Sequence, residues 1–386
     1  MIAKTFFGFE PLLEAELRNL GAQQVESGTR AVSFVGDKGF MYKANLALRT
    51  ALKILKPIKS FRALNEKMLY EGIQKIDWSE FLRVESSFVI DATVHSDFFK
   101  HSEFVAQKTK DAIVDQFRER QGARPSVEKR FPDLRINVHI DRETVTVSLD
   151  SSGASLHQRG YRTATNIAPI NEVLAAGMLL HAGWRGQSDF LDPMCGSGTI
   201  LIEAAMIACN IPANLNRKEF AFEKWRDWDF ELFETVLDSL MKKVVDFDFS
   251  MIGFDKAPSA VAKATENVKQ ANLSEYISVK HLNFFETEKG TDEPLFMLFN
   301  PPYGERLDID LERFYRELGD TLKQHYANTS AWFITANLEA LKFVGLKPSR
   351  KIKLFNANLE SRLVNYQMYS GSKRLKFNQN SDEKIN

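Results

Sequence analysis

The stretch Phe190-Leu191-Asp192-Pro193-Met194-Cys195-Gly196-Ser197-Gly198-Thr199 decides the fold. An apolar run ends in an acidic residue, two glycines follow, and the next ten residues, 199–208, are mostly apolar and of helical length. This pattern predicts a strand, a tight turn and a helix. Such a unit is the building block of a doubly wound, mostly parallel α/β domain, in which ligands bind beyond the carboxyl ends of the strands.

Three classes of ligand bind at glycine turns of this kind. A phosphate-binding P-loop needs a Gly-Lys-Ser/Thr sequence, which is absent. A dinucleotide fingerprint needs a third glycine, and Leu201 stands at that position. The remaining class is S-adenosylmethionine, which carries no pyrophosphate. We expect Asp192 to pair with the amino group of its methionine end.

Two further strand ends extend the predicted donor site. The strand 251–255 ends in Asp255, whose carboxylate is expected to accept both ribose hydroxyls. The strand 277–281 leads to Asn283, expected to bond the adenine edge, and to Phe284, expected to stack on it.

The insert 210–249 separates the first two of these strands. It reads as an extra helical layer.

A fourth strand, 295–299, delivers the sequence Asn300-Pro301-Pro302-Tyr303. We expect the Asn300 amide oxygen and the Pro301 carbonyl to accept the two protons of an exocyclic amine, while Tyr303 stacks on the base. Because the methyl donor is already activated, such a site needs alignment and relief of positive charge more than acid–base chemistry. The predicted catalytic residues are Asn300, Pro301, Pro302 and Tyr303, and the predicted cofactor-binding residues are Asp192, Pro193, Cys195, Gly196, Gly198, Thr199, Asp255, Asn283, Phe284 and Asn300.

Size and composition favour a globular chain of several domains. The 386 residues are 44% hydrophobic, and 51 basic residues balance 51 acidic ones. Two cysteines form neither a disulfide framework nor a metal site. The N-terminus lacks a signal sequence and no apolar stretch is long enough to span a membrane, so a cytoplasmic location is expected.

The rest of the chain reads as two smaller α/β units before the catalytic domain. The predicted domains are 1–55, 56–155, 156–370 and a disordered tail, 371–386. Residues 151–170 are predicted to be a linker. Within the first two units we predict helices over 10–20, 69–81 and 104–120, strands over 31–35 and 88–94, and a hairpin over 134–149.

At this point the sequence resembles the THUMP-domain class I RNA methyltransferases, close to the half of the bacterial 23S rRNA enzyme that modifies guanine N2. The resemblance covers about residues 1–370. It rests on 192–199 and 300–307, with the stretches 111–115, 124–127, 156–162, 168–172 and 353–356. Two departures are Asn283, where the family usually has Asp, and Asn356-Ala357, where it usually has Asn-Gly.

The resemblance implies a ferredoxin-like domain, a THUMP RNA-binding domain and a seven-stranded Rossmann-like methyltransferase domain. It implies methylation of a guanine N2 in RNA, with 23S rRNA or the assembling large ribosomal subunit as partner. Alternatives are a tRNA guanine, a DNA adenine or a protein glutamine as substrate, or a non-catalytic RNA-binding assembly factor.

Local charge favours RNA, because basic clusters attract phosphates. The two clusters are Arg118, Arg120, Arg124, Lys129, Arg130 and Arg135, and Lys347, Arg350, Lys351, Lys353, Arg362, Lys373, Arg374 and Lys376.

Overall fold

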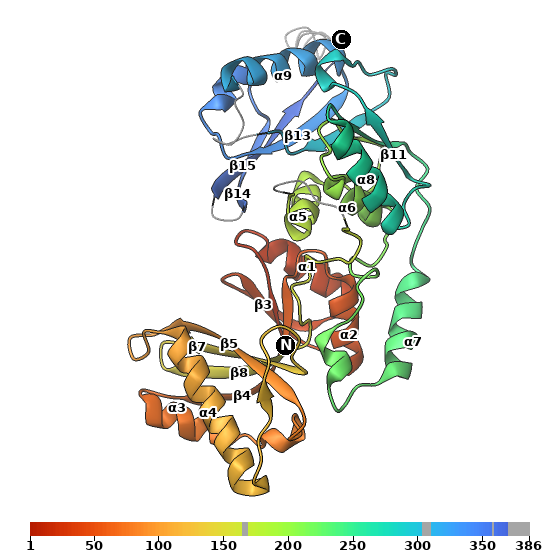
Figure 1. Ribbon diagram of the computed structural model, residues 1–386. Helices are drawn as coiled ribbons and strands as arrows, with labels where there is room; N and C mark the ends of the chain where they lie inside the picture. The colour runs from red at the N-terminus through yellow and green to blue at the C-terminus, as the bar shows by residue number, and fades with distance from the viewer. Residues whose placement is uncertain (164–168, 303–309, 357–358, 370–386) are drawn as a thin grey trace, which may run out of the picture. The chain divides into compact units, whose positions relative to one another are not determined.

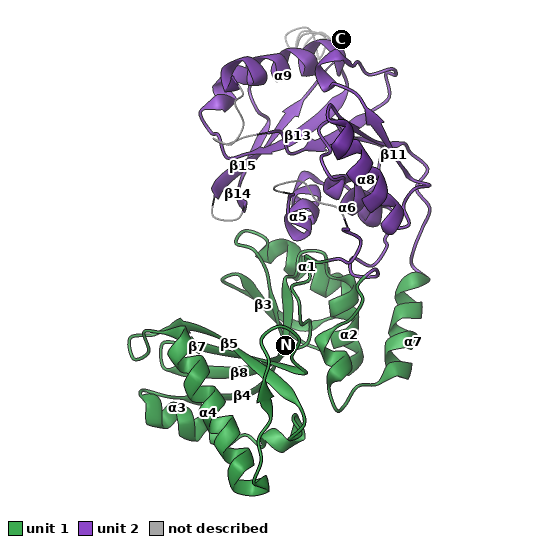
Figure 2. Ribbon diagram, in the orientation of Figure 1, with its two compact units in different colours: residues 1–158, 217–242 green, residues 159–216, 243–386 purple. Residues whose placement is uncertain are grey.

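The computed structural model describes residues 1–163, 169–302, 310–356 and 359–369. The chain forms two compact units, one of residues 1–158 and 217–242 and the other of residues 159–216 and 243–386 (Figure 2). No helix in the described ranges is long and apolar enough to cross a membrane.

The first unit is built on one sheet of eight strands in the order β2-β3-β1-β4-β8-β7-β5-β6 (Figure 1). The two N-terminal α/β units that the sequence predicts therefore share a continuous sheet. The strands are β1 (Ile2–Lys4), β2 (Gln23–Gly28), β3 (Ala31–Val35), β4 (Lys53–Arg62), β5 (Ser87–His95), β6 (Ser126–Val127), β7 (Leu134–Asp141) and β8 (Thr144–Asp150).

The helices of this unit confirm most of the predicted elements. The first helix ends as predicted at Leu20, where Gly21 takes the left-handed φ of 101° that a helix stop favours. The predicted hairpin is the antiparallel pair β7–β8. The helices are α1 (Glu10–Leu20), α2 (Lys38–Ala47), α3 (Glu66–Gln74), α4 (Ser102–Gln121) and α7 (Phe230–Met241), with short 3-10 turns η1 (Trp78–Glu80) and η2 (Ala221–Lys224).

The helix predicted over 69–81 is wrong in its second half, because α3 ends at Gln74. The Gln116 side chain donates to the backbone oxygens of Gln74 and Ile76 and accepts from the Trp78 backbone N–H at 3.0 Å. These bonds satisfy backbone groups that a longer helix would have used. The chain can then turn and bury Trp78 completely.

The sequence suggested that the insert 210–249 is an extra helical layer of the catalytic domain. The structure shows a different placement for most of it. Its central part, 217–242, packs on the first unit, where Phe222, Trp225 and Leu240 join the same hydrophobic core as the N-terminal strands. The ring centroids of Tyr42 and Phe222 are 4.6 Å apart, and α7 packs on α2. Amphipathic periodicity predicts that this segment has an apolar face, but not which surface that face covers.

The second unit is a seven-stranded sheet in the order β11-β10-β9-β12-β13-β15-β14. The first five strands are parallel, and β15 is antiparallel to both of its neighbours. This confirms the doubly wound domain. Its strands are β9 (Asp189–Asp192), β10 (Met251–Asp255), β11 (Ile277–His281), β12 (Leu295–Phe299), β13 (Thr329–Thr335), β14 (Arg350–Asn356) and β15 (Leu359–Gln367).

The helices of the second unit connect these strands and cover the sheet. They are α5 (Glu172–Ala182), α6 (Thr199–Ala208), α8 (Pro258–Gln270) and α9 (Leu311–His325), with 3-10 turns η3 (Phe284–Glu286) and η4 (Ala340–Val344). The strand order reverses at β9, which pairs with β10 on one side and β12 on the other. This topological switch point is where an open α/β sheet binds its ligands.

Candidate functional site

The turn after β9 needs both of its glycines. Gly196 and Gly198 have φ of 56° and 81°, a region that side chains disfavour. A Cβ on Gly198 would also lie 3.2 Å from the Ala264 Cβ of α8. The turn therefore runs close against α8, and α6 begins directly after it at Thr199 with its N-terminal N–H groups at the sheet edge.

Asp192 is the last residue of β9 and is almost fully buried. Its Oδ1 accepts from the Met194 N–H at 3.2 Å, whereas its Oδ2 is buried and has no partner within the described part of the chain. Burial, with a smaller contribution from the Asp255 charge, raises the pKa of Asp192 well above its ordinary value. A donor group from a ligand is what this carboxyl lacks.

Cys195 lies in the same turn and is also buried. Burial, followed by the charges of Asp192 and Asp255, raises the pKa of its thiol. The thiol therefore stays neutral and is no nucleophile.

Asp255, at the end of β10, holds two loops in place. Its Oδ2 accepts from the Gly196 N–H and its Oδ1 from the Ala257 N–H, both at 2.9 Å. The carboxylate thus links the glycine turn to the start of α8. Each oxygen keeps a further lone pair. The bond to the ribose hydroxyls stays a prediction.

Asn283 and Phe284 follow β11 and differ in their surroundings. Asn283 caps the turn η3, and its side chain donates to Glu286 at 2.7 Å. The Phe284 ring packs in the core, with ring centroids 5.2 Å from Tyr326 and 6.3 Å from Phe299. This placement disfavours the predicted stacking of Phe284 on an adenine, because the ring contributes to the core beneath α9.

Asn300 follows β12 directly, at the edge where β9 also ends. Its Oδ1 is buried and has no hydrogen-bond partner in the ranges that the structure describes. Pro301 is buried and Pro302 is partly buried. Tyr303 lies outside the described residues. An unpaired buried amide oxygen costs about 1–3 kcal/mol, which a ligand donor would recover.

The residues 159–163, predicted to be part of a linker, are instead anchored in the second unit. The fully buried Arg159 pairs with Glu203 of α6 at 3.3 Å and bonds Asn214 at 3.2 Å, and the Tyr161 hydroxyl also reaches Glu203. Buried charges are tolerated when they are paired in this way. Sequence reasoning noted the Arg-Gly-Tyr-Arg stretch but assigned it no partner.

Two polar residues connect this anchored segment to the glycine turn. Arg162 donates to the Thr199 hydroxyl at 2.8 Å and pairs with Glu172 at 3.1 Å. Asn267 of α8 accepts from the Thr163 N–H and donates to the Ser197 carbonyl at 2.9 Å. Sequence reasoning missed Asn267, although the spacing from Ala260 and Ala264 places an amide on the buried face of α8.

The predicted basic clusters carry less free charge than their residue counts indicate. In the first unit Arg118, Arg120 and Arg135 form ion pairs with acidic neighbours. In the second unit, Lys353 and Arg362 both pair with Glu360. Lys373, Arg374 and Lys376 lie outside the described residues.

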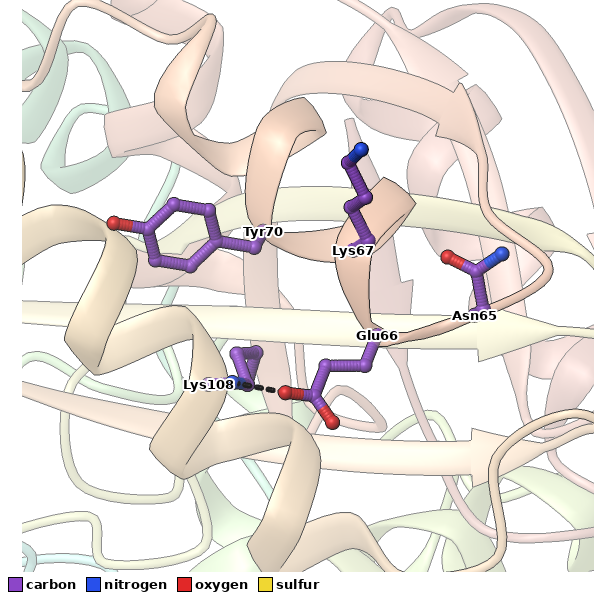
Figure 3. A pocket seen from close by; sticks show the side chains of 5 residues that line it. All are labelled: Asn65, Glu66, Lys67, Tyr70 and Lys108. Carbon is purple, nitrogen blue, oxygen red and sulfur yellow. Dashed lines mark ion pairs between the residues drawn. The ribbon is translucent and has the colours of Figure 1, made fainter.

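The first unit contains a hollow that is not lined by the strand ends of the second unit (Figure 3). Lys108 forms an ion pair with Glu66 there, and burial raises the pKa of Tyr70 to about 12, so its hydroxyl donates to Asp115 at 2.9 Å. None of the predicted site residues lines it. The remaining lining residues are Asn65 and Lys67.

Three family profiles match the chain in sequence order. They are described as the RlmL ferredoxin-like domain (residues 1–55), the THUMP domain (63–150) and the RMKL-like methyltransferase domain (159–365). The resemblance identified from the sequence is thereby confirmed.

Individual relatives agree with these profiles. The ribosomal RNA large subunit methyltransferase K/L of Syntrophotalea carbinolica is 37% identical over 94% of this chain and 52% of its own length. The chain thus spans about half of that relative. A candidate RNA methyltransferase of Synechocystis, slr0064, is 36% identical over 94% of this chain and 95% of its own length.

A solved structure resembles the chain over nearly its whole length. The crystal structure of the methyltransferase candidate SMU.472, complexed with SAH, superimposes with a TM-score of 0.84. It is 30% identical and covers 96% of this chain and 98% of its own. The chain therefore belongs to the family of RMKL-like methyltransferases.

Proposed function

We propose that this protein transfers a methyl group from S-adenosylmethionine to the exocyclic N2 of a guanine in RNA, with 23S rRNA as substrate. The relatives named for large-subunit rRNA support the RNA, and the THUMP match supports a module that binds it. Because those relatives are about twice as long as this chain, their activity is carried over as a proposal.

The residues at the switch point fit this methyl donor. The donor has a cationic amino group and no phosphate, and Asp192 offers a buried carboxyl oxygen that lacks a partner in the described structure. The tight turn at Gly198 and the start of α6, which has no side-chain cap, offer backbone N–H groups to a ligand carboxylate. Asp255 would hold the ribose while it fixes the turn.

The observation that carries the proposal is the buried Oδ1 of Asn300, which has no partner in the described ranges. The amine of guanine is a poor nucleophile because its lone pair is delocalised into the ring. Asn300 Oδ1 and the Pro301 carbonyl would accept the two amine protons and draw the nitrogen towards tetrahedral geometry. Pro301 and Pro302 keep the acceptors rigid.

When bound, S-adenosylmethionine supplies a methyl group that is already activated on a sulfonium. The chain's own task is then to align the amine and to stabilise the positive charge that develops on nitrogen. The target base has to be unpaired or flipped out of its stack to reach Asn300. Tyr303 would stack on it there.

The test uses RNA from a strain that lacks this gene. We expect mass mapping to show one N2-methylguanine missing from 23S rRNA, restored by the wild-type gene and not by Asn300→Ala. Loss of a methylguanine from tRNA instead would establish the alternative substrate. Unchanged methylation in all RNA, or full restoration by Asn300→Ala, would overturn the catalytic proposal in favour of an assembly factor.

A further inference from the structure

The hairpin β14–β15 lies at one end of the strand order of the second unit, beside β13 (Figure 1). Phe299 of β12 pairs with Phe333, and β13 ends two residues later at Thr335, which pairs with Arg362 of β15. Three more residues of β15, 359–361, pair only with β14. At the usual rise of a strand, this overhang extends the hairpin about 10 Å past the end of β13.

Charged side chains occupy one face of the hairpin where this overhang begins, level with the end of β13. Lys353 is directly opposite Arg362, so the two share a face, and Glu360 lies on the same face opposite Phe355. Glu360 accepts from Lys353 at 2.6 Å and from Arg362 at 2.8 Å. One carboxylate therefore holds two cationic groups side by side at the rim.

The hairpin as a whole is basic and accessible. Between residues 350 and 362 the sequence has four basic residues and a single acidic one, Glu360. The Lys353 side chain is 48% exposed and that of Arg362 is 25% exposed. Arg350 and Lys351 are exposed as well. With three positive charges in excess, the hairpin attracts a polyanion even though Glu360 is present.

The hairpin is close enough to Asn300 to reach the nucleotides beside a bound base. Neighbouring strands lie about 4.8 Å apart, so β15 is about 10 Å and β14 about 14 Å from β12. Lysine and arginine side chains shorten these gaps further. A base inserted at Asn300 would leave its sugar and phosphates near this edge of the sheet.

We propose that the hairpin strands of residues 350–356 and 359–362 form a phosphate clamp, in which Lys353 and Arg362 bind the RNA backbone beside the target nucleotide. This inference rests on the proposed function and adds the element that holds the strand. Glu360 holds the two cations side by side and competes with a phosphate for them. Arginine suits the clamp since its planar fork matches the oxygens of a phosphate.

The first test replaces both cations in the full-length protein, as Lys353→Gln with Arg362→Gln. The substrate is protein-free 23S rRNA from a strain lacking the gene. We expect KM for this RNA to rise about tenfold near physiological salt, and the slope of log affinity against log salt to fall by about 1.4, as two lost phosphate contacts predict for a single strand. The rate constant kcat and the affinity for S-adenosylhomocysteine should not change.

The matched control removes the same charge elsewhere in the same unit. Lys269 and Lys323 are exposed in the last turns of α8 and α9, and both helices run from the catalytic edge to the opposite one. Lys269→Gln with Lys323→Gln should leave KM and the salt slope unchanged. If the hairpin and control variants behave alike, the clamp is refuted.

A second variant should strengthen RNA binding instead of weakening it. Glu360→Gln keeps the shape of the side chain and removes the only negative charge of the hairpin, so RNA binding should tighten by about twofold to fivefold. Weaker or unchanged binding would overturn the clamp, and tighter binding cannot arise from a damaged fold. If the hairpin instead binds an acidic protein, its variants should lose capture of that protein while their RNA binding stays unchanged. This result would also overturn the clamp.

The same assays separate the clamp from the proposed function. If the wild-type protein methylates no guanine, the proposed function fails, whatever the hairpin binds. If it methylates 23S rRNA and the hairpin variants match the control, the clamp alone fails.

Discussion

Four of the five parallel strands end at the catalytic edge in polar residues of two kinds. At β10 and β11 the side chains of Asp255 and Asn283 are bonded within the protein, mostly to backbone N–H groups of the next turn. At β9 and β12, by contrast, Asp192 and Asn300 each bury an oxygen that has no partner in the described structure. The second pair flanks the switch point of the sheet.

The difference indicates which residues hold the site together and which are reserved for ligands. A satisfied carboxylate stabilises the fold, whereas a buried unpaired acceptor costs stability until a ligand donates to it. Glu172, whose Oε2 is also unpaired within the described residues, belongs with the second kind. Substituting a residue of the first kind should lower stability. Substituting a residue of the second kind should lower activity without lowering stability.

The largest effect is expected at Asn300. Asn300→Ala should lower kcat by about 100-fold to 1,000-fold, because it removes an acceptor that acts on developing charge. Donor affinity should stay the same, and the melting temperature should not fall, since an unpaired oxygen is lost. Single-turnover kinetics and thermal unfolding measure these quantities. A destabilised protein with normal kcat would place Asn300 with the structural residues.

Glu172 should make stability depend on pH. Burial raises its pKa to about 7 although Arg162 opposes the shift. Between the pKa of the unfolded chain, near 4.5, and about 7, the folded protein holds a proton that the unfolded chain has released, so stability falls as pH rises. Relative to Glu172→Gln, the wild type should lose about 3 kcal/mol over this range. Denaturation at a series of pH values measures the free energy of unfolding of both proteins. If the two values changed with pH in parallel, the prediction would be wrong.

Asp255 should behave as a structural residue first. Asp255→Ala leaves the N–H groups of Gly196 and Ala257 without an acceptor and should lower the free energy of unfolding by about 2 kcal/mol. Asp255→Asn retains one acceptor and should cost about half as much. Calorimetry should also find weaker donor binding, and unchanged affinity would refute the ribose contact.

The smallest effect is expected for Asp192. Asp192→Asn should raise the free energy of unfolding at neutral pH by about 1 kcal/mol, because the buried carboxyl with its raised pKa has to take up a proton on folding and an amide does not. Its donor affinity should drop and lose its pH dependence, whereas wild-type affinity should rise with pH as the carboxyl ionises. A pH-independent wild type would rule out the pairing with the donor's amino group.

The strand–turn–helix pattern of the second unit was predictable to the residue. The bounds of α6, β10, β11 and β12 follow from short apolar runs closed by Asp, Gly or Asn. Polar residues at those closing positions also predicted the edge at which the site lies. Local chemistry is decisive there, since glycine conformation and strand length act within a few neighbours.

Other features depended on contacts between distant residues. The sequence alone determined that 210–249 is a helical insert, that Arg159 and Arg162 follow the THUMP region, and that Asn300 follows a strand. Only the tertiary structure decided that 217–242 packs on the first unit, that Glu203 and Thr199 hold the two arginines, and that the Asn300 Oδ1 has no partner among the described residues. Periodicity fixes which face of an element is apolar, whereas the partner of that face, and of each buried polar group, is chosen among many surfaces by packing and hydrogen-bond geometry.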